Sequence, residues 1–329
     1  MRSLKARGMR LTAIAAGALL ALSACGGGGS VSDTTKANES KAAAAGGDCG
    51  DFNVIVNAWA GYWANAYVVG NVAAEQLGCT VNYLELKEGD PSYQAMASGQ
   101  ADVLLEDWFG SPDDMQAAID AGDIVNAGET GNVGVIGWYV PGWLAEEHPD
   151  VLDFNNLNKY AKEFATSETG GKGQFLGADP TYTQYDESIV KNLGLDFKVI
   201  FSGGEAATVE AFKKAQENKE WLIGYFWEPH PLFAEIPMTR VALPPYADGC
   251  QDDKAAVACD YPATNLVKLA SKKFIDGGSP AAGLVQNFTW TNDDQNTVAK
   301  YITVDGMSNE EAAAKWVADN QDKVDAWLQ

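Results

Sequence analysis

The chain has 329 residues, of which 46% are hydrophobic and 10% aromatic. Its 45 acidic residues outnumber 23 basic residues, which gives a formal net charge of −22 at pH 7. This surplus of negative charge argues against nucleic acid and anionic lipid as partners, and it is compatible with a cationic or zwitterionic ligand. Much of the surplus serves to keep the surface soluble.

Residues 1–25 have the composition of an export signal. Four basic residues precede an apolar stretch at positions 11–22, and the segment ends with Leu22-Ser23-Ala24-Cys25. This tetrapeptide resembles a bacterial lipobox, in which the cysteine is lipidated and becomes the new N-terminus. No other stretch of the sequence approaches the ~18 apolar residues of a membrane span. We therefore expect an extracytoplasmic protein held on the cell membrane by a lipid on Cys25, with an ordinary secretory signal as the alternative.

Residues 26–48 are rich in Gly, Ser, Ala and Thr and show no apolar periodicity. This composition is typical of a flexible tether. The globular region then runs over residues 49–329. It is long enough to form two domains of ordinary size.

Short apolar runs alternate with helical patterns in the first part of the globular region. Strands are expected at residues 52–56, 80–86 and 101–105. Helices are expected at residues 65–77 and 93–98, with a third that begins at Ser111-Pro112. Gly78 and Gly99 stop the first two helices. This order predicts an α/β domain with a largely parallel sheet.

A second unit is expected after the apolar run at residues 133–140. Its helices are predicted at residues 156–164, 186–193 and 206–218, and its strands at 174–177, 197–201 and 221–226. From Thr239 the chain returns to the first unit and finishes with helices, one of which begins at the capping box of Ser308 and Glu311. The predicted lobes are therefore residues 49–140 plus 240–329, and residues 141–239.

Two α/β lobes between which the chain crosses twice are the arrangement of periplasmic-type binding proteins. Such proteins hold a ligand in the cleft between the lobes and close over it by hinge motion. The order of elements alone does not separate this arrangement from that of many two-domain enzymes.

Four cysteines remain once Cys25 is assigned to the lipid anchor, and four cysteines permit three pairings. Cys250 and Cys259 flank a short polar loop, so we pair them with each other, which leaves Cys49 with Cys79. A zinc site is the competing hypothesis, but no histidine lies near any of the four in the sequence. Disulfides are favoured in an exported protein.

The sequence offers little for catalysis. It has two histidines, and it lacks a Gly-x-Ser-x-Gly elbow, a phosphate-binding glycine loop and a histidine-based metal motif. Glu106 and Asp107 are adjacent on a predicted strand, so they point to opposite faces and do not suit an acid–base pair. We expect no enzyme, no cofactor and no metal. An envelope enzyme that acts on choline-containing substrates is the alternative from another class.

Several aromatic residues lie where a predicted strand gives way to a loop or helix, which is the edge where α/β domains bind ligands. They are Trp59, Trp63, Trp108, Tyr182 and Trp227. The face of an aromatic ring attracts positive charge, so these rings suggest a cage for an organic cation. Packing within a lobe is the alternative for each ring.

Residues 101–108 read Ala-Asp-Val-Leu-Leu-Glu-Asp-Trp, residues 177–182 read Gly-Ala-Asp-Pro-Thr-Tyr, and residues 227–231 read Trp-Glu-Pro-His-Pro. Together with Asn57-Ala58-Trp59 and the ending at residues 314–320, these segments resemble the substrate-binding proteins of ABC importers for glycine betaine, choline and related quaternary amines. The match spans nearly all of the globular region. It implies the type II two-lobed periplasmic-binding-protein fold with the ligand in the cleft between the lobes.

The resemblance implies four cage walls: Trp59, Trp108, Tyr182 and Trp227. Trp63 is a rival for the place of Trp59, and Tyr139 is a further candidate at the junction of the lobes. The polar candidates beside the walls are Glu106, Asp107, Asp179, Glu228 and His230. If Glu106 or Glu228 points into the cleft, choline is favoured, because a betaine carboxylate would be repelled by either acid and would need donors such as His230.

The expected partners are a small quaternary ammonium ligand and the permease subunits of an ABC transporter, and the chain is expected to be a monomer. Another cation, such as carnitine or a polyamine, is the alternative ligand for the same fold. A polyamine carries N–H donors and would need several acids that face the cleft.

Overall fold

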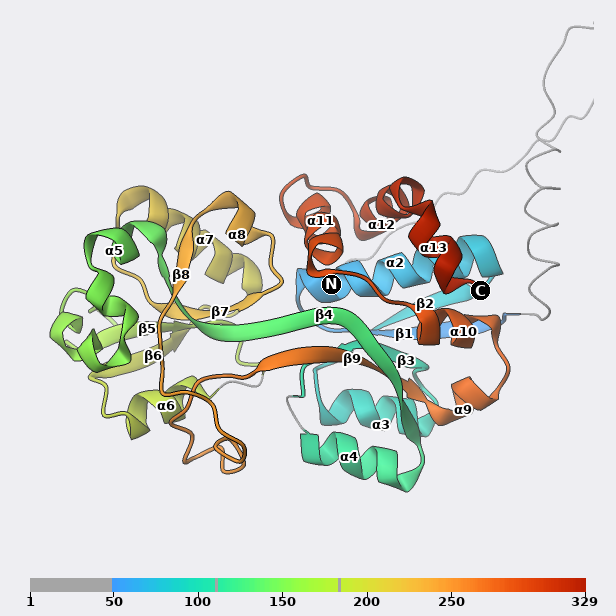
Figure 1. The fold of residues 1–329 in the computed structure, drawn as a ribbon, viewed down its shortest axis with the longest axis horizontal. Helices are drawn as coiled ribbons and strands as arrows, with labels where there is room; N and C mark the ends of the chain where they lie inside the picture. The colour runs from blue at the N-terminus through green and yellow to red at the C-terminus, as the bar shows by residue number, and fades with distance from the viewer. Residues whose placement is uncertain (1–48, 110–111, 183–184) are drawn as a thin grey trace, which may run out of the picture.

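The computed structural model describes residues 49–109, 112–182 and 185–329. Cys25 and the predicted tether lie outside these ranges. Figure 1 shows two groups of helices and strands that lie end to end, with strands β4 and β9 running between them. These groups are the two lobes of the fold, so the predicted α/β architecture is confirmed.

The first lobe is built around three parallel strands, in which β1 lies between β2 and β3. Its strands are β1 (Asp51–Val56), β2 (Thr80–Glu85) and β3 (Val103–Asp107). Its helices are α2 (Ala60–Leu77), α3 (Asp90–Ser98), α4 (Pro112–Ala121), α9 (Lys272–Asp276), α10 (Pro280–Asn287), α11 (Asn292–Thr303), α12 (Asn309–Asp319) and α13 (Gln321–Trp327). Helices α2 and α11–α13 cover one face of the sheet, and α3 and α4 lie on the other (Figure 1). The capping box of Ser308 and Glu311 starts α12 as predicted.

The second lobe holds another set of parallel strands, in which β5 pairs with β6 and β7. Its strands are β5 (Gly173–Gly177), β6 (Phe197–Phe201), β7 (Gly224–Glu228) and β8 (Met238–Arg240). Its helices are α5 (Gly142–Glu147), α6 (Asp186–Asn192), α7 (Glu205–Asn218) and α8 (Leu232–Glu235), with the 3-10 helices η1 (Pro149–Leu152) and η2 (Phe154–Tyr160). The helix predicted at residues 156–164 is therefore a 3-10 helix that begins earlier, where the Asp153 side chain accepts from the backbone N–H of Asn155.

Two long antiparallel strands connect the lobes and join both sets into one sheet of order β2-β1-β3-β9-β4-β7-β5-β6. Strand β4 (Ile124–Pro141) pairs with β9 (Ala263–Ser271) along its first part and with β7 and β8 along its second part. The sequence predicted only residues 133–140 of β4 and did not predict β9. The glycines of β4 explain the first difference, because Gly128 and Gly131 have positive φ angles and resemble turn residues, while the register with β9 shifts around them.

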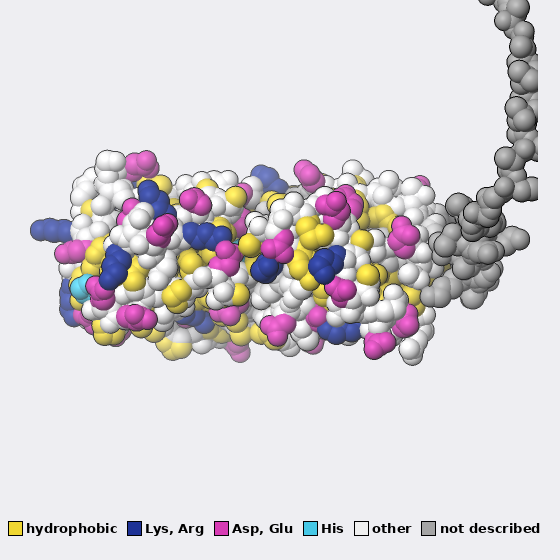
Figure 2. All heavy atoms as spheres, turned by 90° about the horizontal axis from the view of Figure 1, so that it is seen from above, with side chains coloured by type: hydrophobic (Ala, Val, Ile, Leu, Met, Phe, Trp, Pro, Cys, Tyr) yellow, Lys and Arg dark blue, Asp and Glu magenta, His cyan; other side chains and the backbone are white. Residues whose placement is uncertain are grey.

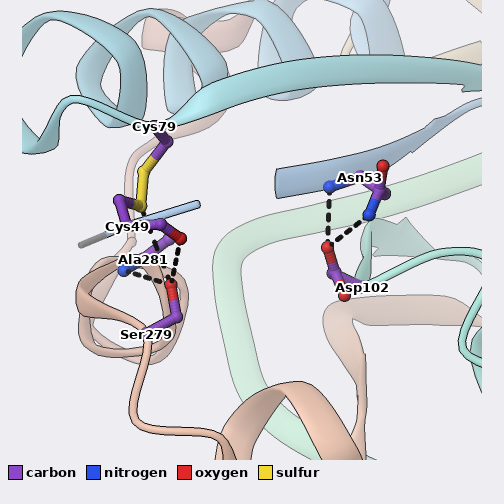
Figure 3. Close-up of a disulfide and its surroundings, with 6 residues drawn as sticks. All are labelled: Cys49, Asn53, Cys79, Asp102, Ser279 and Ala281. Carbon is purple, nitrogen blue, oxygen red and sulfur yellow. Dashed lines mark hydrogen bonds between the residues drawn. A yellow bond between two sulfur atoms is a disulfide. The ribbon is translucent and has the colours of Figure 1, made fainter. Parts of the chain in front are cut away.

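The structure contains the two disulfides that the sequence predicts, Cys49–Cys79 and Cys250–Cys259. The first joins the start of the described chain to the residue before β2, and Ser279 at the N-cap of α10 lies beside it (Figure 3). The second closes a loop between β8 and β9. That loop forms part of the cavity described below.

The charge is dispersed over the face of the molecule seen in Figure 2. Figure 2 shows acidic side chains scattered along one long face and interleaved with basic ones. Within the described ranges, no helix is both long enough and apolar enough to cross a membrane.

Candidate functional site

A cavity of about 430 Å³ lies between the lobes, a size that suits a small molecule. Its walls include four of the predicted aromatic residues: Trp59, Trp108, Tyr182 and Trp227. The first two come from the first lobe and the other two from the second lobe. The sequence reasoning therefore placed these four rings at one site.

The ends of the parallel strands bring the rings together. Trp59 and Trp108 follow β1 and β3, whose carboxyl ends lie at the same edge of the sheet because the two strands are parallel. Trp227 lies at the end of β7, and Tyr182 lies in the loop after β5, which is parallel to β7. Each lobe thus presents one edge of its sheet to the cavity.

Tyr182 connects the rings of the two lobes. Its ring lies edge-on to Trp59 at 5.5 Å and to Trp227 at 5.7 Å between ring centroids. Its hydroxyl donates a hydrogen bond of 3.3 Å to the carbonyl oxygen of Ala58. These contacts cross from the second lobe to the first, so the structure has the lobes closed over the cavity.

Glu106 lies behind the two tryptophans of the first lobe and is fully buried. Its Oε1 accepts from the indole N–H groups of Trp59 at 2.9 Å and Trp108 at 2.6 Å. Its Oε2 accepts from Gln295 at 2.8 Å and from Asn65. Burial raises the pKa of Glu106 above its ordinary value, and the four donated hydrogen bonds act in the opposite direction. Because all its acceptor sites are used, Glu106 positions the two rings and does not face the cavity.

Two other acids beside the tryptophans also point away from the cavity, contrary to the possibility raised by the sequence. Asp107 accepts from the Tyr93 hydroxyl at 2.7 Å and from the Phe109 backbone N–H at 2.8 Å. Glu228 accepts from the Tyr139 hydroxyl at 3.2 Å, and the Tyr139 ring packs in a separate hydrophobic cluster of the second lobe. None of Asp107, Glu228 and Tyr139 lines the cavity.

Trp63 and Asp179 are also directed elsewhere. The indole N–H of Trp63 donates to the carbonyl oxygen of Asn57 at 2.9 Å, and Trp63 is not among the residues that line the cavity. The Asp179 carboxylate accepts from the backbone N–H of Thr181 at 2.8 Å and shapes the loop that carries Tyr182. Of the two rival candidates, Trp59 and Trp63, Trp59 is therefore the one that lines the cavity.

His230 belongs to a buried link between the lobes. Its Nδ1 accepts from the backbone N–H of Leu232 at 3.1 Å, so Nε2 carries the proton and donates to Glu205 at 2.8 Å. The other oxygen of Glu205 accepts from the backbone N–H of Ala60 at 2.9 Å. Glu205 begins α7 in the second lobe, and Ala60 begins α2 in the first lobe. A carboxylate from one lobe thus caps a helix of the other.

Replacing Glu205 by alanine is expected to weaken ligand binding by about tenfold, because a hydrogen bond to a charged group contributes roughly 1.5 kcal/mol or more to the closed form. Titration calorimetry measures the affinity, and small-angle scattering reports whether the lobes separate. Glu210→Ala, on the exposed part of α7, is the control. Equal affinity of Glu205→Ala and the unmodified protein would contradict a role in closure.

The sequence reasoning missed several residues of the cavity wall, among them Glu88, Tyr185, Tyr225 and Tyr261. Glu88 follows β2, so the same strand-end argument that found the tryptophans applies to it. Tyr225 lies on a strand that was predicted at residues 221–226 and is observed at Gly224–Glu228, but that its side chain faces the cavity required knowledge of the register. Tyr261 follows the disulfide loop and gives no sequence signal.

The fold and the cavity define a two-lobed solute-binding protein. The family model for the substrate-binding domain of ABC-type glycine betaine transport systems matches residues 29–319. The chain therefore belongs to this family, whose members are solute-binding components of ABC transporters and not enzymes.

Among curated proteins, the chain is 27% identical over 275 residues to the trimethylamine N-oxide-binding protein of Pelagibacter ubique, a match that covers 80% of this chain and 86% of that protein. It is 29% identical over 122 residues to a glycine betaine/carnitine transport binding protein of Listeria monocytogenes, which covers 37% of this chain and 36% of that protein.

Solved structures show the same fold. The lactococcal glycine betaine-binding protein in its closed, liganded conformation has a TM-score of 0.67 at 21% identity, over 85% of this chain and 99% of that chain. A choline-binding protein in complex with choline also has a TM-score of 0.67, at 19% identity, over 85% and 92% of the two chains.

Proposed function

We propose that this protein captures a methylated ammonium compound in an aromatic cage formed by Trp59, Trp108, Tyr182 and Trp227, and delivers it to the permease of its ABC transporter. The observation that supports the proposal most directly is the convergence of the four rings on one cavity from both lobes. The curated relatives, which bind trimethylamine N-oxide and glycine betaine or carnitine, agree with a ligand of this class.

The chemistry of a trimethylammonium group suits such a cage. The group cannot donate a strong hydrogen bond, so a ring face attracts it without leaving a donor unsatisfied. A desolvated cation–π contact contributes up to about 2 kcal/mol, and four contacts would reach about 8 kcal/mol, which corresponds to roughly micromolar affinity.

The cavity mouth adds a weaker, longer-range attraction. Asp113, Asp114 and Asp252 line the cavity and are solvent-exposed, and Lys254 is the exposed base among them. Exposed charges are screened by salt, so these acids serve to steer the positive end of a ligand toward the cavity more than to bind it. A polyamine would need such acids deeper inside, among the rings.

The proposal extends to the whole chain. Lipidation at Cys25 would hold the protein on the outer face of the membrane, and residues 26–48 would let the lobes reach the permease as a monomer. We place the lobe boundaries near residues 140 and 240, where β4 ends and β8 ends. Hinge motion in the strands β4 and β9, which connect the lobes, would open and close the cavity.

Titration calorimetry with glycine betaine, choline, carnitine and trimethylamine N-oxide tests the proposal, with spermidine as the representative polyamine. We expect heat of binding and a change of tryptophan fluorescence with at least one methylated ammonium compound, because three of the four cage residues are tryptophans and the fourth, Tyr182, contacts two of them. If none of the four compounds gives heat of binding or a fluorescence change, the cage is refuted. Binding of spermidine alone would favour the polyamine alternative.

A further inference from the structure

Glu88 is the acid that the structure places at the wall of the cavity with an unused oxygen. It lies in the loop between β2 and α3, in the first lobe. Its Oε1 is buried and accepts no hydrogen bond from any of the described residues. In contrast to Glu106, whose four acceptor sites are all occupied, Glu88 has capacity left for a group that enters the cavity.

The surroundings of Glu88 are negative or neutral. Asp107 and Glu106 on β3 and Tyr93 on α3 interact with it electrostatically. The cavity groups of the second lobe that interact with it are Tyr182, Tyr185 and Tyr225. The remaining charged residues of the cavity are the exposed Asp113, Asp114, Asp252 and Lys254. No buried base compensates a charge on Glu88 among the lining residues.

A carboxyl group in this position holds its proton at neutral pH. Burial raises the pKa of Glu88 to about 8, the charges of Asp107 and Glu106 add to the rise, and the backbone N–H of Trp108 acts against it. A protonated carboxyl can donate one hydrogen bond, whereas an ionised one can only accept.

On the basis of the proposed function, we propose that Glu88 selects between ligands by the charge at the end of the ligand that projects beyond the aromatic cage. In its protonated form Glu88 donates a hydrogen bond to the anionic oxygen of a zwitterion, such as a carboxylate or an N-oxide. In its ionised form, the negative charge of Glu88 compensates the positive charge of a methylated ammonium compound that has no anionic oxygen. At neutral pH the site therefore takes a zwitterionic methylated amine in preference to a plain cation.

The two classes of ligand differ in their proton balance. A zwitterion binds to protonated Glu88, so below about pH 8 no proton enters or leaves, and above it one proton is taken up from the solvent for each zwitterion bound. A plain cation binds to ionised Glu88, so below about pH 8 one proton passes from the carboxyl to the solvent for each cation bound. The affinity for each class thus depends on pH in opposite directions.

Titrations of glycine betaine and choline between pH 6 and 9.5 test the proposal on the unmodified protein and on Glu88→Gln. For the unmodified protein, choline should bind about tenfold more tightly per pH unit up to about pH 8, and glycine betaine should weaken by about tenfold per unit above it. The glutamine amide imitates the protonated acid. Glu88→Gln should therefore keep the betaine affinity of the unmodified protein at pH 6, lose the decline above pH 8, and bind choline weakly at every pH.

A control and a separate readout distinguish the possible failures. Glu85→Gln, on the exposed end of β2, should behave as the unmodified protein. If Glu88→Gln keeps both pH dependences, Glu88 is not the selector, while the cage stands. If none of glycine betaine, choline, carnitine and trimethylamine N-oxide binds the unmodified protein at any pH, the proposed function falls, and this inference with it.

The unfolding temperature of the ligand-free protein reports the titration of Glu88 independently. The folded protein holds a proton on Glu88 up to about pH 8, whereas the unfolded chain releases it near the ordinary value of about 4.5. Stability contributed by this group is therefore present at low pH and lost as the pH rises from about 4.5 to 8. Glu88→Gln lacks that loss, so its unfolding temperature should rise relative to the unmodified protein over this range. Parallel curves would overturn the proposal.

Discussion

Replacing Trp227 by alanine is expected to weaken binding of the methylated ammonium ligand by about thirtyfold. A desolvated contact between a cation and an indole ring contributes up to about 2 kcal/mol, which converts to this factor. Trp227 is well placed for such a contact, because its side chain lines the cavity and the Tyr182 ring lies edge-on against it. Titration calorimetry with the best ligand measures the loss.

Two further variants distinguish a contact between the cation and the ring of Trp227 from simple apolar packing at that position. Trp227→Phe keeps a ring face and should lose only part of the affinity, whereas Trp227→Leu keeps an apolar side chain and should behave like the alanine variant. Trp221→Leu is the matched control, because Trp221 packs against Trp143 and His148 outside the cavity. If the leucine and phenylalanine variants at position 227 bind alike, the ring face is not what holds the ligand.

Replacing Glu106 by alanine is expected to lower the free energy of unfolding by about 4 kcal/mol and to weaken binding at the same time. The substitution leaves four buried donors without an acceptor, and each unsatisfied donor costs about 1–3 kcal/mol. Two of these donors are the indoles of Trp59 and Trp108, which then lose the contact that fixes their orientation. Urea unfolding measures the stability, and titration of the folded variant measures the affinity.

A glutamine at position 106 provides the intermediate case, because its amide has one acceptor oxygen and directs an NH₂ group at two of the former donors. Its stability should therefore lie between those of the alanine variant and the unmodified protein. Glu75→Ala, on the exposed face of α2, controls for the loss of a negative charge. An alanine variant at position 106 that unfolds like the control would show that the buried carboxylate does not hold Trp59 and Trp108 in place.

The strand-end argument predicted the aromatic residues of the cavity wall because it depends on local order. Trp59, Trp108 and Trp227 lie at or just beyond strands whose apolar runs were clear, and parallel strands bring their carboxyl ends to one edge. The lobes followed from the alternation of strands and helices. These features need no knowledge of contacts between distant parts of the chain.

The directions of the acids could not be predicted, because distant residues decide them. Glu106 turns inward since Asn65 on α2 and Gln295 on α11 supply its donors, and Gln295 lies 189 residues away in the sequence. Tyr139 lies on the long strand β4, where its register with β7 and β8 directs it to the second core and not to the cavity. We therefore assign the choice between a cationic and a zwitterionic ligand to Glu88 and not to Glu106.

The hydrogen bonds of Glu106 also set the order of events when a ligand arrives. Its four donors all belong to the first lobe, so Trp59 and Trp108 keep their places whether the cavity is open or closed. Tyr182 and Trp227 travel with the second lobe. We therefore expect a ligand to contact Trp59 and Trp108 first and to be enclosed by Tyr182 and Trp227 when the lobes close. On this basis the first pair of rings is expected to govern the rate of capture, and the second pair the time that the ligand stays bound.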